Sequence, residues 1–448
     1  MRSRFDCTTC VLILLLPILL SGCSNSGKTV SSITSSPTSQ WVVGWGASPQ
    51  NALATSSNPG GSEQSFRFIV VPTLAGSRER VRFSNYFGAT AISIGSARLA
   101  IASGSGPAID KAHDAALTFS GNPSVTIQPN QEVYSDPVDV SYTYGQKLAI
   151  SVYMQGSFPA LTEHDSQVET NFTTPIGAGD ATNDSTGASF TETTTEWLSI
   201  SNVDVYGPYE GTVAVFGSSS VDGHNSNYGD TNSYPAANVP VPGQDNERPS
   251  DWLGKSLNAA AIPVGVLNAG LMGDAAGTST SGATSGLDRI DHDVLQQPGI
   301  KAVVIYIGGI DVRTYCLPAT TVEGTLTAIV AKAHAAGIRI ILATLPPSEY
   351  CTTGSPLPTS DNPYAGDVNP GPENPGSTQR RALNAWIRET GSQLAGVVSI
   401  ADFDAALADP AHPDFMIPSL NSGDNFHPNG AGYGVQNSAI DITAILGK

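Results

Sequence analysis

The sequence predicts an α/β fold, in which a five-stranded doubly wound parallel sheet is preceded by an all-β, sandwich-like domain. Two observations lead to this prediction. From Ser65 to about Tyr209, short strand-like segments follow one another with turns between them and no helical period. After Gly211 the pattern changes to apolar strands that alternate with helices. Successive short strands are typical of sandwiches, whereas strand–helix alternation is typical of parallel sheets.

The all-β domain is expected over residues 41–210 and the α/β domain over residues 211–448. The first begins with WVVGWGASPQ, and its strands include SFRFIVVPTL, RERVRFSNYFG, ISIGSARLAIAS, SVTIQ, EVYSDPVDV, KLAISVYM and EWLSISNVDVYG. Short β segments at this spacing indicate a β-sandwich. A chain of 448 residues is long enough for two or three domains with a sizeable core.

The α/β domain is expected to contain five parallel strands, at 212–216, 263–268, 302–307, 338–344 and 396–400. Helices are expected at about 249–260, 321–336, 377–391 and 431–446. The third of these helices illustrates the pattern, because Leu383, Trp386 and Ile387 recur at helical spacing. Parallel strands joined by right-handed crossovers form a doubly wound sheet.

The composition argues against nucleic acid as a partner. The formal net charge is −18, and charged residues make up 13% of the chain. A protein that binds the phosphate backbone needs a basic stripe, and none is visible in the sequence. The acidic excess fits a solvated surface of an exported protein rich in Gly, Ser and Thr.

The N-terminus has the pattern of an export signal of a lipoprotein. Two arginines precede an apolar run from Val11 to Leu20, which is too short to span a membrane and suits a signal-peptide core. Leu20-Ser21-Gly22-Cys23 follows and resembles a bacterial lipobox, whose cysteine is lipidated. We therefore expect a signal peptide over residues 1–22 and a flexible tether over 23–40. An ordinary signal peptide with an incidental cysteine is the alternative.

These features predict a protein that is exported and anchored by lipid to a bacterial membrane, facing the periplasm or the cell exterior. Cleavage would remove Cys7 and Cys10, and the lipid would occupy Cys23. Cys316 and Cys351 would remain. Two leftover cysteines in an oxidising compartment are expected to form a disulfide.

A candidate nucleophile follows the first strand of the α/β domain. Thr212 to Gly223 reads TVAVFGSSSVDG, so a buried strand breaks into a glycine and three serines. Ligands of open α/β sheets bind at the carboxyl ends of strands. Gly217-Ser218-Ser219 resembles block I, Gly-Asp-Ser, of the SGNH/GDSL hydrolases, and this resemblance implies Ser219 as the nucleophile. Ser218 stands where the family has Asp. A simple Ser/Gly-rich loop is the alternative.

A candidate base and its orienting acid lie near the C-terminus. The pattern Asp-x-x-His occurs at Asp424…His427, and also at Asp110…His113 and Asp409…His412. Asp424 and His427 follow the fifth strand and precede the last helix, from where a loop can reach the carboxyl edge of the sheet. Their surroundings, SGDNFHPNGAGY, resemble block V of the same family.

The resemblance implies a flavodoxin-like SGNH fold and acyl transfer through a serine, without a metal or cofactor. Ser219 would attack the ester, His427 would take and return its proton, and Asp424 would hold the imidazole. The motif VRFSNYFG at 81–88, together with WVVGWGASPQ, resembles the front part of a secreted subfamily.

The oxyanion hole is where the chain departs from the family pattern. Asn268 to Asp274 resembles block II and implies the N–H of Gly273 as a donor, beside the N–H of Ser219. Block III, Gly-x-Asn-Asp, appears as Gly308-Gly309-Ile310-Asp311, and Ile310 cannot replace the side-chain donor of the family's Asn. Losing one such donor typically costs about 10²–10³ in kcat.

The sequence thus predicts a serine esterase of carboxylic esters, with acetyl or short-acyl esters of carbohydrate as the favoured substrates because the loops near the site are polar. The alternative is a catalytically weakened lipoprotein of the same fold, which binds carbohydrate or serves a structural role. Ser218 and Ile310 favour this alternative, whereas Ser219, Asp424 and His427 argue against it. A lipase is a third possibility.

Overall fold

The computed structural model describes residues 37–52, 54–55, 58–165, 168–226, 246–279, 283–348, 375–424 and 426–447, of which 375–377 are described by their backbone. Residues 37–448 form one compact unit. Among the described residues, no helix is both long and apolar enough to cross a membrane.

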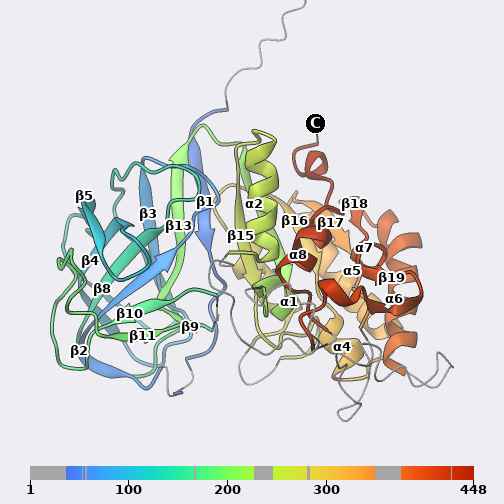
Figure 1. The fold of residues 1–448 in the computed structure, drawn as a ribbon, viewed down its shortest axis with the longest axis horizontal. Helices are drawn as coiled ribbons and strands as arrows, with labels where there is room; N and C mark the ends of the chain where they lie inside the picture. Colours follow the sequence, from blue (N-terminus) through green and yellow to red (C-terminus); the bar gives the residue numbers. More distant parts are fainter. Residues whose placement is uncertain are drawn as a thin grey trace, which may run out of the picture. The chain divides into compact units, whose positions relative to one another are not determined.

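The first half of this unit consists of two main antiparallel sheets (Figure 1). The four-stranded sheet has the order β1-β13-β3-β7, with bounds Gln40–Gly46, Ile200–Gly207, Glu79–Asn85 and Gln131–Tyr134. The seven-stranded sheet has the order β11-β10-β2-β8-β4-β5, with β6 also paired to β4. Its strands are β2 Gly61–Val70, β4 Ile92–Ala102, β5 Ile109–Ala116, β6 Val125–Ile127, β8 Leu148–Phe158, β10 Asn171–Thr173 and β11 Glu192–Thr194. A two-stranded ribbon joins β9 Glu163–His164 to β12 Trp197–Leu198.

The two main sheets share one hydrophobic core, which makes this half a sandwich. Phe66 and Phe68 of β2 belong to the same buried cluster as Val81 and Phe83 of β3. Side chains at alternate positions of a strand point to the same face, so each sheet contributes one face to this core. Among the described residues from 37 to 210, the chain forms no helix, as the sequence predicts.

The second half contains a five-stranded parallel sheet with the order β15-β14-β16-β17-β18. Its strands are β14 Gly211–Gly217, β15 Val264–Gly270, β16 Ile300–Tyr306, β17 Arg339–Ala343 and β18 Val397–Ala401. All five predicted strands are therefore present, with ends within two residues of the prediction. This order is that of a flavodoxin-like doubly wound sheet, whose ligands bind where the order reverses, between β14 and β16. The predicted fold class is confirmed.

Helices connect these strands as crossovers. They are α1 Ser219–Asp222, α2 Pro249–Ala259, α3 Gly286–Ile290, α4 Gly309–Arg313, α5 Ala319–Ala335, α6 Pro375–Glu389, α7 Phe403–Leu407 and α8 Gly430–Asn437. A π-helix follows α3 at Asp291–Leu295, and single 3₁₀ turns lie at Gly391–Gln393, Pro418–Leu420 and Ile442–Ile445. Right-handed crossovers place α2 on one face of the sheet and α3, α5 and α6 on the other. In agreement, α2 packs on α8, and α5 packs on α3 and α6.

The predicted helix over 431–446 is wrong in its extent. α8 ends at Asn437, and Asp441 then caps a separate 3₁₀ turn by accepting the N–H of Thr443. Three glycines within GAGYG weaken the helix, and an Asp side chain competes for backbone donors. A small antiparallel pair, β19 Ala408–Asp409 and β20 His412–Met416, precedes this region.

Strand β1 joins the two halves. Val43 of β1 belongs to the buried core of the parallel sheet, and its N–H donates to the Thr212 hydroxyl at 3.0 Å. Gly265 of β15 approaches β1 so closely that an added Cβ would stand 2.0 Å from the Val43 carbonyl oxygen. The sandwich is therefore packed directly on β14 and β15.

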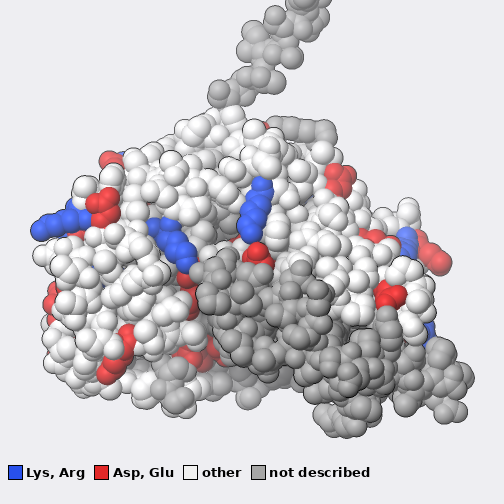
Figure 2. Space-filling view, viewed as in Figure 1, with Lys and Arg blue, Asp and Glu red and all other residues white. Residues whose placement is uncertain are grey.

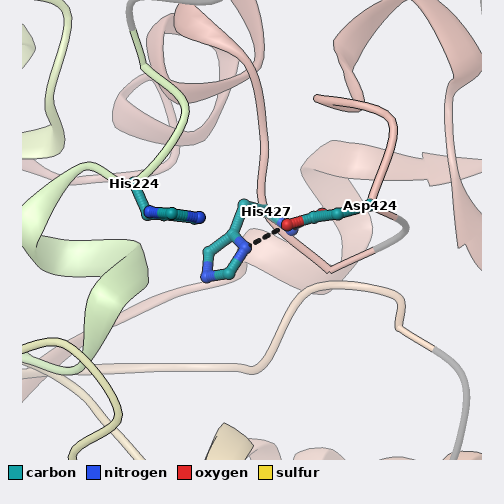
Figure 3. Close-up of side chains that lie close together, drawn as sticks. All are labelled: His224, Asp424 and His427. Atoms are coloured by element: carbon teal, nitrogen blue, oxygen red, sulfur yellow. Dashed lines mark hydrogen bonds and ion pairs between the residues drawn. The ribbon is translucent and has the colours of Figure 1, made fainter. Parts of the chain in front are cut away.

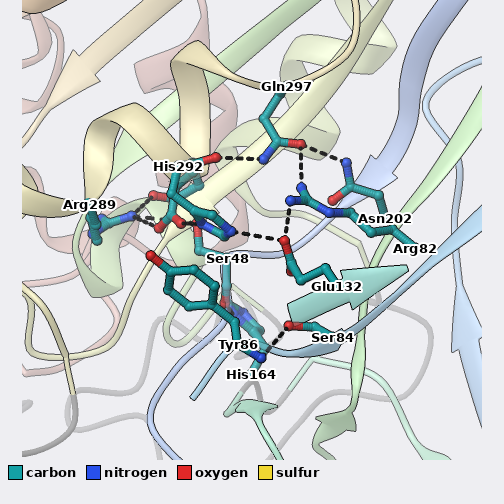
Figure 4. Close-up of polar contacts among 12 residues, drawn as sticks. Ser48, Arg82, Ser84, Tyr86, Glu132, His164, Asn202, Arg289, His292 and Gln297 are labelled. Carbon is teal, nitrogen blue, oxygen red and sulfur yellow. Dashed lines mark hydrogen bonds and ion pairs between the residues drawn. The ribbon is translucent and has the colours of Figure 1, made fainter. Parts of the chain in front are cut away.

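A network of buried and half-buried polar side chains also links the halves (Figure 4). His292, from the π-helix, contacts Glu132 of β7 through Nε2 at 3.0 Å. Glu132 also accepts from Arg82 of β3, and Arg82 donates to Gln297 at 3.3 Å. Gln297 in turn accepts from Asn202 of β13 at 2.8 Å. Three strands of the sandwich are thus tied to one segment of the α/β half.

On the face shown in Figure 2, charged side chains are scattered among uncharged ones.

Candidate active site

Ser219 lies at the carboxyl end of β14, where the strand order of the parallel sheet reverses. It is the first residue of α1, and Ser218 before it is extended, with φ −95° and ψ −153°. Gly217 ends β14 against β16, where an added Cβ would stand 1.9 Å from the Tyr306 carbonyl oxygen. A glycine is therefore required there, and it lets α1 begin directly at the sheet edge.

His427 and Asp424 meet Ser219 across the sheet edge. Ser219 Oγ lies 2.8 Å from His427 Nε2. His427 Nδ1 lies 2.5 Å from Asp424 Oδ2, and Figure 3 shows this second contact. Ser219 and His427 are buried. A hydroxyl, an imidazole and a carboxylate in this sequence of contacts form the arrangement that activates a serine for acyl transfer.

The carboxylate of Asp424 is held on both oxygens. Oδ1 accepts the backbone N–H groups of Phe426 and His427 at 2.9 and 2.8 Å, and Oδ2 accepts from the Asn225 amide at 3.2 Å. Burial opposes ionisation of Asp424, but the attraction of His427 and these hydrogen bonds outweigh it. The pKa of Asp424 therefore lies well below its usual value.

His224 lies beside the three. Its ring meets that of His427 edge to face, with centroids 4.6 Å apart. Burial lowers the pKa of His224, and the neighbouring His427 lowers it further. The imidazole of His224 therefore has its lone pair available at neutral pH more readily than an exposed histidine.

The two loops predicted to form the oxyanion hole are joined by Asp311. Its carboxylate accepts the N–H groups of Ala276 and Gly277 at 2.8 and 3.3 Å, so the loop after β16 is tied to the loop after β15. Gly273 lies in the latter loop, is exposed, and has φ +69°, which favours glycine. Ile310 is half-buried, is the second residue of α4 and lies outside the buried core cluster.

A buried arginine supports the site from behind. The guanidinium of Arg289 donates to the carbonyl oxygens of Gly217 at 2.7 Å and Ala269 at 3.0 Å, at the ends of β14 and β15. It also pairs with Asp274 and Asp293 at 2.7 and 2.9 Å. These bonds fix the two strand ends from which Ser219 and Gly273 extend.

The structure brings Ser219, Asp424 and His427 together, and it places Gly273 and Ile310 on loops at the same sheet edge. Cys23 and Cys351 lie outside the described residues, whereas Cys316 is described and is disulfide-bonded. Sequence reasoning missed several supporting residues, namely His164, His224, Asn225, Arg289 and Asp311. Asp311 had a signal, because it occupies the last position of the block III motif.

Comparison with known proteins gives a family and several solved structures. The profile of the GDSL-like Lipase/Acylhydrolase family matches residues 215–435. The α/β half of this chain belongs to that family. The match covers the serine, the histidine and the aspartate described above, and it makes the chain an ester hydrolase of the GDSL type. No curated protein matches the sequence.

Three solved structures illustrate the similarity. A carbohydrate acetylesterase family member from Sinorhizobium meliloti is 15% identical, with 53% of this chain and 100% of that chain covered and a TM-score of 0.37. A GDSL-like lipase from Bacteroides thetaiotaomicron is 16% identical, with 52% and 88% covered and a TM-score of 0.35. A family two carbohydrate esterase from Cellvibrio japonicus is 12% identical, with 92% and 98% covered and a TM-score of 0.33.

Proposed function

We propose that this hydrolase cleaves short-acyl esters, acetyl esters above all, with Ser219 as nucleophile and His427 as general base. Asp424 would orient the imidazole. The observation that carries the proposal is the 2.8 Å contact between Ser219 Oγ and His427 Nε2, backed by the contact of His427 Nδ1 with Asp424. Geometry of this kind is the first requirement for general-base activation of a hydroxyl.

The reaction proceeds in two halves. Ser219 Oγ attacks the ester carbonyl carbon while its proton passes to His427 Nε2, and the negative charge moves to the carbonyl oxygen. The tetrahedral intermediate collapses, the C–O bond to the alcohol breaks, and His427 returns the proton to the departing oxygen. Water, activated by the same imidazole, then hydrolyses the acyl-serine and releases the carboxylic acid.

The oxyanion would be stabilised by backbone donors. Ser219 is the first residue of α1, so its N–H has no partner within the helix. The N–H of Gly273 is the second donor that we assign. Ile310 supplies no side-chain donor, which limits the transition-state stabilisation to backbone groups and lowers kcat by about 10²–10³ relative to a three-donor site.

We assign the acyl group to a small cavity whose lining includes both sequence neighbours of Ser219. This cavity encloses about 10 Å³ and is lined by Ser218, Ser220, Tyr306, Gly309, Leu345, Pro346, Ser348 and Phe426. Such a volume is roughly the room of one water-sized group, which matches the methyl of an acetyl group. A long acyl chain would require the lining to open. We therefore assign short acyl groups to this site.

The alcohol part is proposed to be a carbohydrate. The stretches at 223–246 and 275–286, which follow the first two strand ends of the parallel sheet, are rich in Gly, Ser, Thr and Asn. Side chains of this kind hydrogen-bond to hydroxyl groups and offer little apolar surface to a lipid. The alternative of a binding module without catalysis is disfavoured by the assembled Ser219–His427–Asp424 contacts.

The acyl preference is tested with p-nitrophenyl acetate, butyrate and octanoate. We expect kcat/KM to fall by about 10-fold or more from acetate to butyrate, as for added methylenes in a tight pocket. Phe426→Ala should shift this ratio toward butyrate. Gly309→Ala, whose Cβ would stand 3.4 Å from the Phe426 ring, should shift it toward acetate. The acyl assignment would be refuted by equal rates on acetate and octanoate, together with a ratio of kcat/KM for butyrate and acetate that neither variant changes.

The carbohydrate assignment is tested separately, with acetylated oligosaccharides against short triacylglycerols. We expect acetate release from the oligosaccharides to have the higher kcat/KM. A preference for the triacylglycerols would overturn this assignment and leave the acyl assignment in place.

We also propose that the protein is exported and anchored through a lipid on Cys23, because of the LSGC sequence after the apolar run. Cells fed a radiolabelled fatty acid should label the protein, and Cys23→Ser should abolish this labelling. A Cys23→Ser protein that still carries the label would contradict the anchor.

A further inference from the structure

Three possible metal ligands gather at the proposed active site. One donor atom from each of His224, Asp424 and His427 lies within 4.8 Å of the others (Figure 3). Two imidazoles and a carboxylate are a donor set that zinc accepts. His224 has no place in the hydrolytic reaction described above, so its position beside the other two needs another account.

The backbone of His224 is fixed from two sides. Its N–H donates to the Ser219 carbonyl oxygen at 2.9 Å, and its own carbonyl oxygen accepts from the Tyr433 hydroxyl at 2.9 Å. Tyr433, from α8, is fully buried. The imidazole of His224 is therefore presented from a position that is tied both to α1 and to α8.

We propose that His224, Asp424 and His427 form an inhibitory site for Zn²⁺. The proposal rests on the proposed function, because inhibition follows from the role assigned to His427. The metal takes no part in the hydrolytic reaction and competes with it.

The geometry requires small side-chain movements. Zinc binds imidazole nitrogen at about 2.0–2.1 Å and carboxylate oxygen at about 2.0–2.2 Å in tetrahedral sites, which places donor atoms about 3.4 Å apart. The three donor atoms already lie within 4.8 Å of one another. The contact of 2.5 Å between His427 Nδ1 and Asp424 Oδ2 must widen if the ion enters between them.

Binding of the ion to either ring nitrogen of His427 would block catalysis. Coordination through Nδ1 would displace the hydrogen bond with Asp424, which holds the imidazole in place. Coordination through Nε2 would occupy the lone pair that accepts the Ser219 proton. Metal binding and proton transfer therefore exclude each other, whichever nitrogen is the ligand.

The donor chemistry also predicts which ions act. Imidazole suits Zn²⁺ and Cu²⁺, whereas Mg²⁺ and Ca²⁺ prefer sites made of oxygen. Zinc should inhibit at micromolar concentration, and magnesium or calcium at millimolar concentration should not. Addition of EDTA should restore the rate.

The test compares His224→Phe with a matched control. Phenylalanine keeps an aromatic edge against His427 but has no nitrogen ligand. The control is His113→Gln, which removes an exposed histidine. His113 contacts Asp110 at 2.7 Å, and the two are three residues apart, as Asp424 and His427 are. Inhibition by ZnCl₂ is measured as loss of p-nitrophenyl acetate hydrolysis, relative to the uninhibited rate of each variant.

We expect the half-inhibiting zinc concentration to rise by about 10-fold or more in His224→Phe and to stay unchanged in His113→Gln. Zinc binding is measured independently by equilibrium dialysis on Ser219→Ala, which has no activity to lose. His224→Phe added to this variant should lower the stoichiometry by one zinc per chain.

Unchanged inhibition and unchanged stoichiometry in His224→Phe would overturn the zinc site. The uninhibited hydrolysis rate reports on the proposed function alone. A protein that hydrolyses the ester and is unaffected by 1 mM zinc would refute the zinc site and leave the esterase assignment intact. A protein that binds zinc through His224 but does not hydrolyse the ester would support the zinc site and refute the esterase assignment.

Discussion

His164 of the sandwich contacts Asp222, three residues after Ser219, through Nε2 and Oδ1 at 2.9 Å. The other ring nitrogen, Nδ1, lies 2.7 Å from the Ser48 carbonyl oxygen. Both side chains of the pair are buried. A carbonyl and a carboxylate can only accept, so His164 carries a proton on each nitrogen and forms a buried ion pair with Asp222. Burial lowers the pKa of His164, but Asp222 and the two hydrogen bonds outweigh it and raise the pKa above its ordinary value.

This pair predicts that the sandwich holds α1 in place. His164→Ala should lower the free energy of unfolding by about 3–5 kcal/mol, because Asp222 would remain buried without its partner. It should also lower kcat more than it raises KM, because Ser219 is carried by the same helix as Asp222. Denaturant unfolding and steady-state kinetics measure the two effects.

The control is the double variant His164→Ala with Asp222→Asn, which removes the unpaired charge. Stability should recover in part, whereas kcat should stay low. A single variant with wild-type kcat would show that His164 does not position the nucleophile.

Stability should also depend on pH through His292. Burial opposes protonation, but the contacts with Asp293 and Glu132 raise the pKa of His292 to about 9. Arg82, which binds Glu132, and Tyr86, which stacks on the ring at 4.0 Å, also face this group. The folded-state pKa exceeds the unfolded value of about 6.5, so the contribution is complete below pH about 6.5 and is lost as pH rises through about 9.

The expected loss is about 3 kcal/mol, from 1.36 kcal/mol for each pKa unit. Chemical denaturation between pH 6 and 10 measures it. His292→Gln should flatten the alkaline part of the curve, and the exposed-site variant His113→Gln should leave it unchanged. An alkaline fall of the same size in His292→Gln would refute the assignment.

The third prediction concerns the oxyanion hole. Ile310→Asn should introduce a side-chain donor where the family has one, and kcat should rise by up to about 10²–10³ with little change in KM. Ile310 is half-buried and lies outside the core cluster, so the change should cost little stability. Unchanged kcat in a stable variant would mean that another group already serves as the donor.

Cys316 is disulfide-bonded, and Cys351, outside the described residues, is its predicted partner. Non-reducing peptide mapping should recover one cross-linked peptide that contains both cysteines. Its reduction should lower stability by about 3–4 kcal/mol in the chain-entropy model, for a loop of roughly 35 residues. Two free thiols at these positions in the denatured, non-reduced protein would contradict the pairing.

Local sequence patterns were sufficient for the strands and for the residues that the structure brings together at the proposed site. The apolar run of β14 is buried on both faces, and such a run is recognisable without knowing its neighbours. Asp424 and His427 lie in one loop, so their contact depends on local chain geometry. Ser219 lies just after the end of β14, so the position of the strand indicates the position of this serine.

The supporting contacts could not be predicted in the same way. His164 meets Asp222 across 58 residues, and Arg289 meets Gly217 across 72 residues. Nothing in the sequence around either residue indicates its partner, because the pairing depends on how the sandwich and the parallel sheet pack. His224 lies five residues after Ser219, yet its contact with His427 likewise depends on a loop 203 residues further along the chain.

Labelling with a fluorophosphonate probe, followed by mapping of the modified peptide, shows whether Ser219 is the activated nucleophile. The probe reacts with a serine that a neighbouring base has activated. We expect Ser219 to carry the label, Ser219→Ala to abolish it, and Ser218→Ala and Ser220→Ala to retain it. His427→Ala should also abolish labelling while the fold persists. A label that survives in Ser219→Ala, or that maps to Ser218 or Ser220, would show that Ser219 is not the activated nucleophile.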